Sequence, residues 1–152
     1  MKTYNISNKL TDLRFSNLLQ FSKSMNGSFL MVKRNTLGPK GTSLIQKLAP
    51  FLIKRERTSH WPGTVLLTGQ QCEVIQYRLT NEAIEILKNE FKDIFELIGP
   101  EYPEDLCFLR STGEAWFVSI SHERDYYVIL TEEEKDNFES LVGKGCLELQ
   151  VS

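Results

Sequence analysis

Three short apolar runs in the last third of the chain constrain its fold more than any other feature of the sequence. They cover residues 106–110, 115–121 and 126–130, with four residues between successive runs. Short runs rich in aromatic and β-branched residues are typical of strands, and connections this short join antiparallel neighbours. The sequence therefore predicts a three-stranded antiparallel meander.

Alternation within the middle run predicts that the sheet has one dry face and one wetter face. Trp116 and Val118 fall on one side of this strand, whereas Phe117, Ser119 and Ser121 fall on the other. Because successive side chains of a strand point to opposite faces, the two serines are expected to share a face that is less apolar.

Apolar residues that recur three and four positions apart predict three helices before the meander. Their caps are Thr11 or Asp12, Thr42 or Ser43, and the Thr80-Asn81 pair. Pro50 falls within the second pattern, and because proline has no N–H to donate, we expect either a kink there or a fresh helix with Pro50 in its first turn. After the meander, Thr131 and Glu134 have the spacing of a capping box, so a fourth helix is predicted that ends at Gly143.

Further strands are predicted outside the meander. They lie at residues 28–34, at 64–67 paired as a hairpin with 72–78, and at 146–151 on an edge of the sheet. Strands and helices in this order indicate one α+β domain over residues 1–152. We expect an antiparallel sheet, made of the C-terminal three-strand meander plus N-terminal strands, with about four helices packed mainly on one face.

The sequence carries no pattern of a membrane span, a signal peptide or a metal site. Its apolar runs are far shorter than the roughly 20 residues of a spanning helix, and its first twelve residues are mostly polar. Cys72, Cys107 and Cys146 are odd in number and too far apart for a zinc or redox pair. We therefore expect a cytoplasmic protein with three reduced cysteines, without a metal or a cofactor.

Charge is divided unevenly along the chain. Residues 1–60 carry eleven lysines and arginines against Asp12 and Glu56, whereas residues 61–152 carry seven against eighteen carboxylates. Two oppositely charged halves can face each other inside one fold, or they can remain outside and meet a charged partner. Because surface ion pairs contribute only about 0–1 kcal/mol each, most of these charges are expected to stay in water.

The leading functional hypothesis is a non-catalytic module that binds a protein partner through its charge-polarised surface. Its acidic half offers carboxylates next to tyrosines near predicted strand ends and turns, a combination that suits an interface. The candidate protein-binding residues are Glu101, Tyr102, Glu104, Asp105, Glu123, Asp125 and Tyr126. In size, single-domain α+β character and acidic face, the chain is similar to bacterial immunity proteins that neutralise a basic toxin, which implies an immunity- or inhibitor-like role.

The basic half favours an alternative, the binding of a nucleic acid or another phosphate ligand. Lys40, Lys47 and Lys54 recur every seven residues and would form one cationic stripe if the second helix stays straight through Pro50. The candidate residues for this alternative are Lys33, Arg34, Lys40, Lys47, Lys54, Arg55, Arg57 and Trp61, whose ring could stack on a base. A lysine stripe is also what the solvated face of a helix presents.

A third hypothesis is a small enzyme that uses His122. This residue lies in the segment Ser121-His122-Glu123-Arg124-Asp125, which combines a base, acids, a cation and a hydroxyl. The same residues make an ordinary polar turn, and neighbours within one turn are no sign of a catalytic triad. His60, beside Trp61, is either part of a recognition loop or a histidine packed on an aromatic ring.

Overall fold

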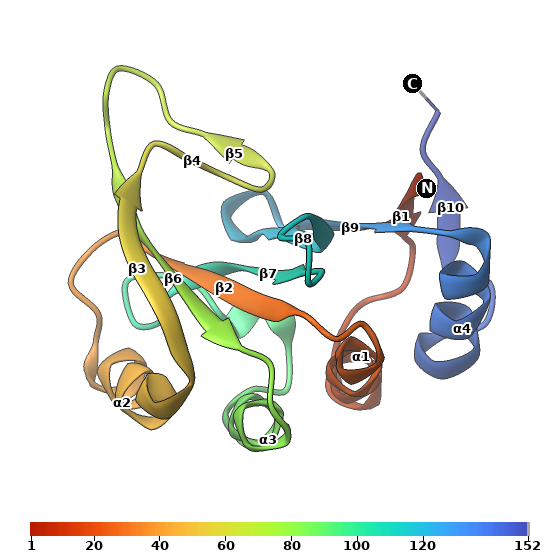
Figure 1. The fold of residues 1–152 in the computed structure, drawn as a ribbon, viewed down its shortest axis with the longest axis horizontal. Helices are drawn as coiled ribbons and strands as arrows, with labels where there is room; N and C mark the ends of the chain where they lie inside the picture. Colours follow the sequence, from red (N-terminus) through yellow and green to blue (C-terminus); the bar gives the residue numbers. More distant parts are fainter. Residues whose placement is uncertain (152) are drawn as a thin grey trace.

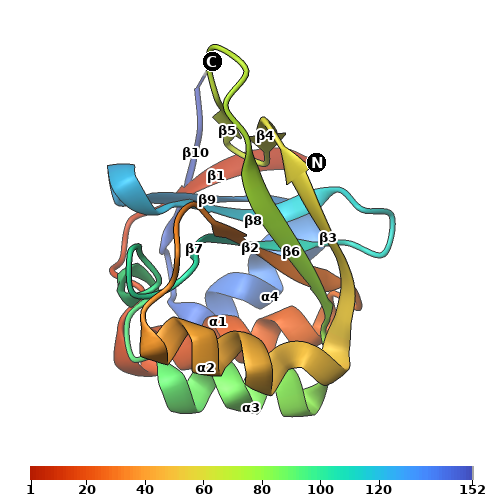
Figure 2. The same ribbon diagram turned by 90° about the vertical axis from the view of Figure 1, so that its left-hand side faces the viewer.

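Within residues 1–151, the part of the chain that the computed structural model describes, an eight-stranded antiparallel sheet carries four helices on one face (Figures 1 and 2). The helices are α1 (Asp12–Ser24), α2 (Pro39–Leu48), α3 (Asn81–Glu90) and α4 (Glu132–Val142). The strands are β1 (Lys2–Ile6), β2 (Ser28–Lys33), β3 (Leu52–Thr58), β4 (His60–Trp61), β5 (Thr64–Val65), β6 (Cys72–Arg78), β7 (Glu104–Leu109), β8 (Ala115–Ile120), β9 (Asp125–Leu130) and β10 (Leu147–Leu149).

The predicted α+β fold is confirmed, and the meander forms the middle of the sheet. The strand order is β10-β1-β9-β8-β7-β2-β6-β3, so the predicted meander is β7, β8 and β9. β10 is an edge strand, as expected, whereas β1, which the sequence did not predict, lies between β9 and β10. The capping box is also confirmed, since Thr131 Oγ1 accepts the N–H of Glu134 at 3.2 Å and Glu134 Oε1 accepts the N–H of Thr131 at 2.9 Å.

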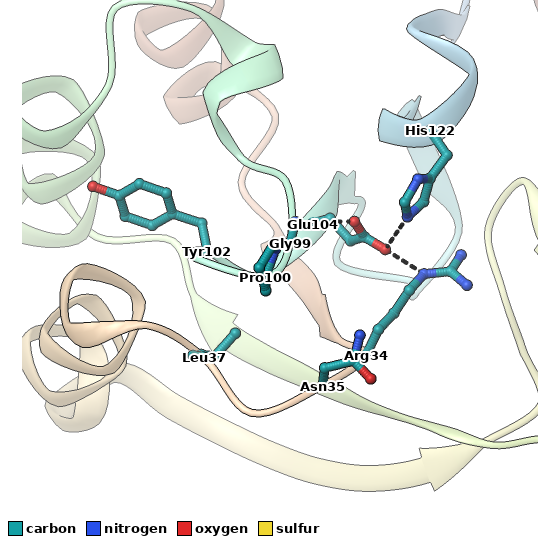
Figure 3. Close-up of a pocket in the computed structure, with 8 residues that line it drawn as sticks. All are labelled: Arg34, Asn35, Leu37, Gly99, Pro100, Tyr102, Glu104 and His122. Carbon is teal, nitrogen blue, oxygen red and sulfur yellow. Dashed lines mark hydrogen bonds and ion pairs between the residues drawn. The ribbon is translucent and has the colours of Figure 1, made fainter.

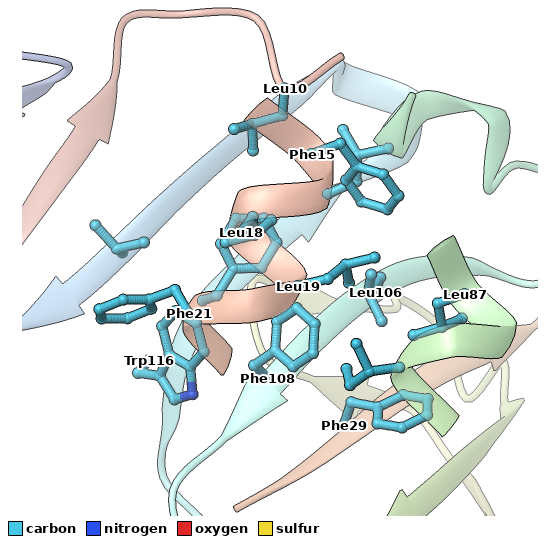
Figure 4. Packing of buried hydrophobic residues seen from close by; sticks show 14 of the residues in the cluster. Leu10, Phe15, Leu18, Leu19, Phe21, Phe29, Leu87, Leu106, Phe108 and Trp116 are labelled. Carbon is cyan, nitrogen blue, oxygen red and sulfur yellow. The ribbon is translucent and has the colours of Figure 1, made fainter. Parts of the chain in front are cut away.

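The main hydrophobic core lies between the sheet and the helices, with α1 across its centre (Figure 4). Leu18 of α1 is fully buried, and Phe21 packs edge-on against Trp116 with ring centroids 5.4 Å apart. Trp116 in turn stacks on Phe108 of β7 at 5.3 Å. Because a fully buried large apolar side chain contributes about 1.5–3 kcal/mol, this layer is the main source of stability.

The opposite face of the sheet is also apolar, because the β4–β5 hairpin covers part of it. Trp61 of the hairpin packs against apolar residues of β2, β6, β7 and β8. The predicted wetter face is therefore wrong: Phe117 is buried on the helix side and Val118 on the hairpin side. Ser119 is buried too, and its hydroxyl donates to the carbonyl of Leu106 at 2.7 Å.

At Pro50 the second helix does not continue straight, and of the two expected alternatives the structure has a fresh helical turn, of 3-10 type, with Pro50 near its start. α2 ends at Leu48, a single 3-10 turn η1 (Ala49–Phe51) follows, and the chain continues as the extended strand β3. Proline in that turn has no N–H with which to continue the helical hydrogen bonds. Lys54 therefore lies on a strand, and the predicted stripe with Lys40 and Lys47 is not formed.

The pairing of the strands corrects one other predicted element. Residues 64–67 do not form a hairpin with 72–78, because β5 pairs with β4, and β6 enters the large sheet between β2 and β3. α3 ends at Glu90, because Phe91 takes an extended backbone, and a short 3-10 turn, η2 (Ile94–Glu96), follows.

Two further predictions from the sequence concern membrane-spanning helices and the state of the cysteines. Across residues 1–151, no helix has both the length and the apolar character needed to cross a bilayer. Cys72, Cys107 and Cys146 are free and buried. Burial raises the pKa of the Cys107 thiol to about 12, so this group is protonated and behaves as a small apolar side chain.

Candidate functional site

Two adjacent carboxylates are buried at the start of the central strand β7. Glu104 is 1% exposed and Asp105 is 0% exposed, and Asp105 has a positive φ of 55°. Burying a charge is costly unless it is paired and hydrogen-bonded, and left-handed backbone costs a residue with a side chain about 1–2 kcal/mol. Because such costs tend to gather at functional positions, this pair marks a candidate site.

Glu104 is held by donors from three other parts of the chain. Its Oε1 lies 3.0 Å from Nε2 of His122 and forms an ion pair with Nε of Arg34, while Oε2 accepts the backbone N–H of Gly99 at 3.2 Å. Figure 3 shows His122 and Arg34 reaching this carboxylate from two sides. A carboxylate oxygen accepts hydrogen bonds, so the contact between His122 and Glu104 gives Nε2 of the imidazole the donor role.

Asp105 is held in the same way by neighbouring elements. Its Oδ2 accepts the indole N–H of Trp61 at 3.0 Å, and its Oδ1 accepts the backbone N–H of Ser121 at 2.8 Å. Nη2 of Arg34 lies 3.6 Å from Oδ2, and the same guanidinium lies 5.2 Å from the centre of the Trp61 ring. One arginine therefore serves both carboxylates and covers the indole.

A pocket of about 350 Å³ opens beside Glu104. Its wall consists of Arg34, Asn35, Leu37, Gly99, Pro100, Tyr102, Glu104 and His122 (Figure 3). The side chain of His122 is 57% exposed and that of Arg34 is 27% exposed, whereas Glu104 is closed off beneath them. The imidazole and the guanidinium are thus charged or titratable groups that solvent reaches at the pocket, whereas the carboxylate is covered.

The chemistry open to this cluster is set by where its hydroxyl and imidazole point. A histidine oriented by a carboxylate can act as a base through its other nitrogen. Ser121, however, is in the short turn η3 (Ser121–Glu123), and its hydroxyl donates to the carbonyl of Leu97 and accepts the N–H of Asp105, both at 3.0 Å. Among the described residues, no group of three or more His, Cys, Asp or Glu side chains is arranged to hold a metal ion.

The structure divides the predicted protein-binding residues between the interior and the surface. Glu104 and Asp105 are buried, so they cannot belong to an exposed acidic face as expected. Glu101 is also engaged, because its Oε1 accepts the N–H of Lys40 at 2.8 Å in the first turn of α2. That helix begins at Pro39, three residues before the predicted cap at Thr42, and the Glu101 carboxylate replaces a side-chain cap there.

The other members of that set lie closer to the surface. The hydroxyl of Tyr102 donates to Glu90 at 3.1 Å, and that of Tyr126 donates to the carbonyl of Asn8 at 2.8 Å. Both rings are half-buried, so they pack within the fold as well as reaching its surface. Glu123 and Asp125 are exposed around η3.

The predicted phosphate-binding residues also separate into two groups. The first is exposed or half-buried and consists of Lys33 on β2, Lys40 and Lys47 on α2, and Lys54, Arg55 and Arg57 on β3. The second group, Arg34 and Trp61, contacts the buried carboxylates Glu104 and Asp105. Trp61 is 6% exposed, so the expected stacking of its ring on a base is not possible in this structure.

The structure thus brings together residues that were predicted separately, under the protein-binding, the phosphate-binding and the enzyme hypotheses. These residues are Arg34, Trp61, Tyr102, Glu104, Asp105 and His122. Sequence reasoning missed Gly99 and the pairing itself, and it considered Ser121 only as a hydroxyl next to His122. The available signal was a pair of carboxylates placed directly before an apolar strand, where their burial requires cationic or N–H partners.

The edge strands β3 and β10, with α2 and α4 near them, lie at opposite ends of the sheet (Figure 1), and these two regions differ in charge. Residues 39–58, which include α2 and the edge strand β3, carry five cations against Glu56. Residues 131–149, which include α4 and the other edge strand β10, carry six carboxylates against two lysines. Among the described residues, only Lys2, Arg34 and Arg55 of the first sixty form ion pairs with carboxylates of the later part, so the two halves do not neutralise each other.

Comparisons with protein-family models, with curated proteins and with solved structures find no match for this chain.

Proposed function

We propose that this chain is a non-catalytic module that binds a protein partner through its charge-polarised surface. The observation that carries the proposal is the separation of exposed cations and carboxylates to opposite ends of one sheet. Such a distribution orients a charged partner during its approach and accelerates association, while it contributes little to the stability of the fold. An immunity- or inhibitor-like role fits this proposal, and so does the cytoplasm, where free cysteines stay reduced.

The surroundings of His122 support a binding module more than an enzyme. Its Nε2 is held by the buried Glu104, and the neighbouring Ser121 hydroxyl is bonded to backbone groups rather than to the imidazole. Nucleophilic catalysis needs a nucleophile within hydrogen-bond reach of its base. The cluster instead fastens β4, β7, η3 and the segment after β2 to one another, which gives the surface a rigid support.

The nucleic-acid alternative has less support. The helix that would have carried its cationic stripe ends at Leu48, and Arg34 and Trp61 are occupied by the buried carboxylates. The remaining cations on α2 and β3 could still meet phosphates. Binding of a nucleic acid is therefore one outcome of the following test.

The test measures how charge reversal at each end of the sheet changes association with a partner. The tagged chain captures its partner from native extract, and association rates are then measured in a salt series. One variant combines Glu132→Lys, Glu133→Lys and Asp136→Lys on α4; the other combines Lys40→Glu and Lys47→Glu on α2. Their side chains are exposed, so both variants should keep the fold.

We expect one of the two variants to slow association about tenfold and to flatten its salt dependence. The charge-conserving double variant Lys40→Arg with Lys47→Arg should associate like the native chain. Equal association rates for all variants would refute the proposal. If nuclease treatment abolishes the capture of the partner, the proposal is also refuted, in favour of the nucleic-acid alternative.

A further inference from the structure

β3 forms an open edge of the sheet. Among the described residues it pairs only with β6, and all of its residues except Thr58 are exposed. Figure 2 views the molecule from this side, with β3 toward the reader. Every second residue of an antiparallel edge strand directs its N–H and C=O away from the sheet, so this edge offers unpaired backbone groups.

A groove of about 360 Å³ lies beside this edge on the hairpin side of the sheet. Lys54, Glu56 and Thr58 of β3 line it together with the rings and aliphatic side chains of Trp61, Pro62, Leu30, Val74 and Leu109. The groove therefore has an apolar floor and a polar rim, which suits a partner that inserts apolar side chains.

The two faces of β3 differ in charge. Arg55 and Arg57 are opposite Ile75 and Glu73 of β6, and Arg55 forms an ion pair with Glu73. These arginines alternate with Lys54 and Glu56, so they lie on the face away from the groove. The edge as a whole has three cations against one carboxylate, and a neighbouring strand that carries carboxylates would complement it.

We propose that the free edge of β3 binds an extended acidic segment of the protein partner, which adds a further strand to the sheet. This inference rests on the proposed function and specifies its binding mode. Main-chain hydrogen bonds supply affinity in such strand addition, and alternate side chains supply specificity. Acidic residues of the segment lie beside Arg55 and Arg57, and the apolar residues between them face the groove.

A second copy of the chain fits this edge less well than an acidic segment. Pairing of two β3 strands in one continuous sheet places Arg55 and Arg57 of both copies on the same face. Like charges on neighbouring strands destabilise their pairing, and charged edge strands are a common protection against self-association.

The experiment adds a capped seven-residue peptide, alternating glutamate with valine and matched in length to β3, to the full chain. Binding and amide hydrogen exchange are followed by NMR. We expect alternate amides of β3 to exchange more slowly with this peptide and not with its lysine–valine analogue. The double variant Arg55→Glu with Arg57→Glu should bind the glutamate peptide about tenfold more weakly. Arg57→Glu alone should weaken binding of the glutamate peptide about threefold. This single variant keeps the test valid if the double variant unfolds.

The matched control is the double variant Lys9→Glu with Lys144→Glu, two exposed cations away from β3, and it should bind like the native chain. Equal binding of the two peptides, or unchanged exchange of β3 amides at millimolar peptide, would overturn the inference. Slower exchange produced by raising the protein concentration alone would overturn it in favour of a second copy. A captured partner that binds without changing β3 exchange would overturn the strand addition and leave the proposed function standing.

Discussion

Replacing Asp105 with alanine should remove a large part of the stability of this fold. The substitution leaves the indole N–H of Trp61 and the backbone N–H of Ser121 without their acceptor, and an unpaired buried donor costs about 1–3 kcal/mol. Alanine must also adopt the left-handed backbone at φ 55°, a conformation that aspartate tolerates better. We expect a loss of about 3–6 kcal/mol from a total that is typically about 5–15 kcal/mol.

Urea unfolding followed by tryptophan fluorescence measures this loss, because Trp61 contacts the site directly and Trp116 reports on the main core. Asp105→Asn keeps one acceptor oxygen and turns an amide toward the other donor, so it should cost about 1–3 kcal/mol. Asp136→Ala, on the exposed face of α4, is the matched control and should stay within about 0.5 kcal/mol of the native chain. A cost below about 1 kcal/mol for Asp105→Ala would refute the view that this carboxylate organises its surroundings.

Three further predictions test other parts of the structure. The Arg110 guanidinium lowers the pKa of Glu134 to about 2, so this pair stabilises the fold above the unfolded pKa of about 4.3 and is lost as the pH falls toward 2. Urea unfolding at about pH 6 and pH 2.5 measures this effect. Between these pH values the free energy of unfolding of Arg110→Met should fall by about 1 kcal/mol less than that of the native chain, and equal falls would contradict the role of this ion pair. A Cβ on Gly27 would clash with the carbonyl oxygen of Leu109, so Gly27→Ala should cost about 1–3 kcal/mol in thermal unfolding, and an unchanged melting temperature would count against this packing. Because burial raises the pKa of Cys107 to about 12, thiol labelling followed by mass spectrometry should modify it only in denaturant; rapid labelling of the native chain would disprove its burial.

The elements that could be predicted from the sequence are those determined by residues close together in the chain. The meander strands were marked by apolar runs and short turns, and α4 by the Thr131–Glu134 capping box. β1 was missed because its place depends on distant partners: Lys2 pairs with Leu130, on a strand near the other end of the chain. β3 was missed because its exposed, charged sequence lacks the apolar alternation of a half-buried strand.

The contacts within the candidate site could not be predicted from the sequence, because they join residues that are far apart in the chain. Its charged and aromatic residues could be singled out by type, but charge and polarity do not specify which cation meets which carboxylate. Arg34 was therefore grouped with the exposed lysines, and Glu104 with the exposed acids, although the two form one buried ion pair. Only the arrangement of β2 beside β7 brings them together.

The position of β1 affects the order in which this protein can fold during synthesis. β1 is made first, yet both of its neighbours, β9 and β10, are made after most of the chain. On the ribosome, residues 2–6 must therefore wait unpaired while the sheet from β3 to β9 assembles, because no earlier strand is adjacent to them. A chain truncated before residue 125 should accordingly leave this N-terminal segment accessible to protease, whereas the released chain that includes β9 and β10 should protect it.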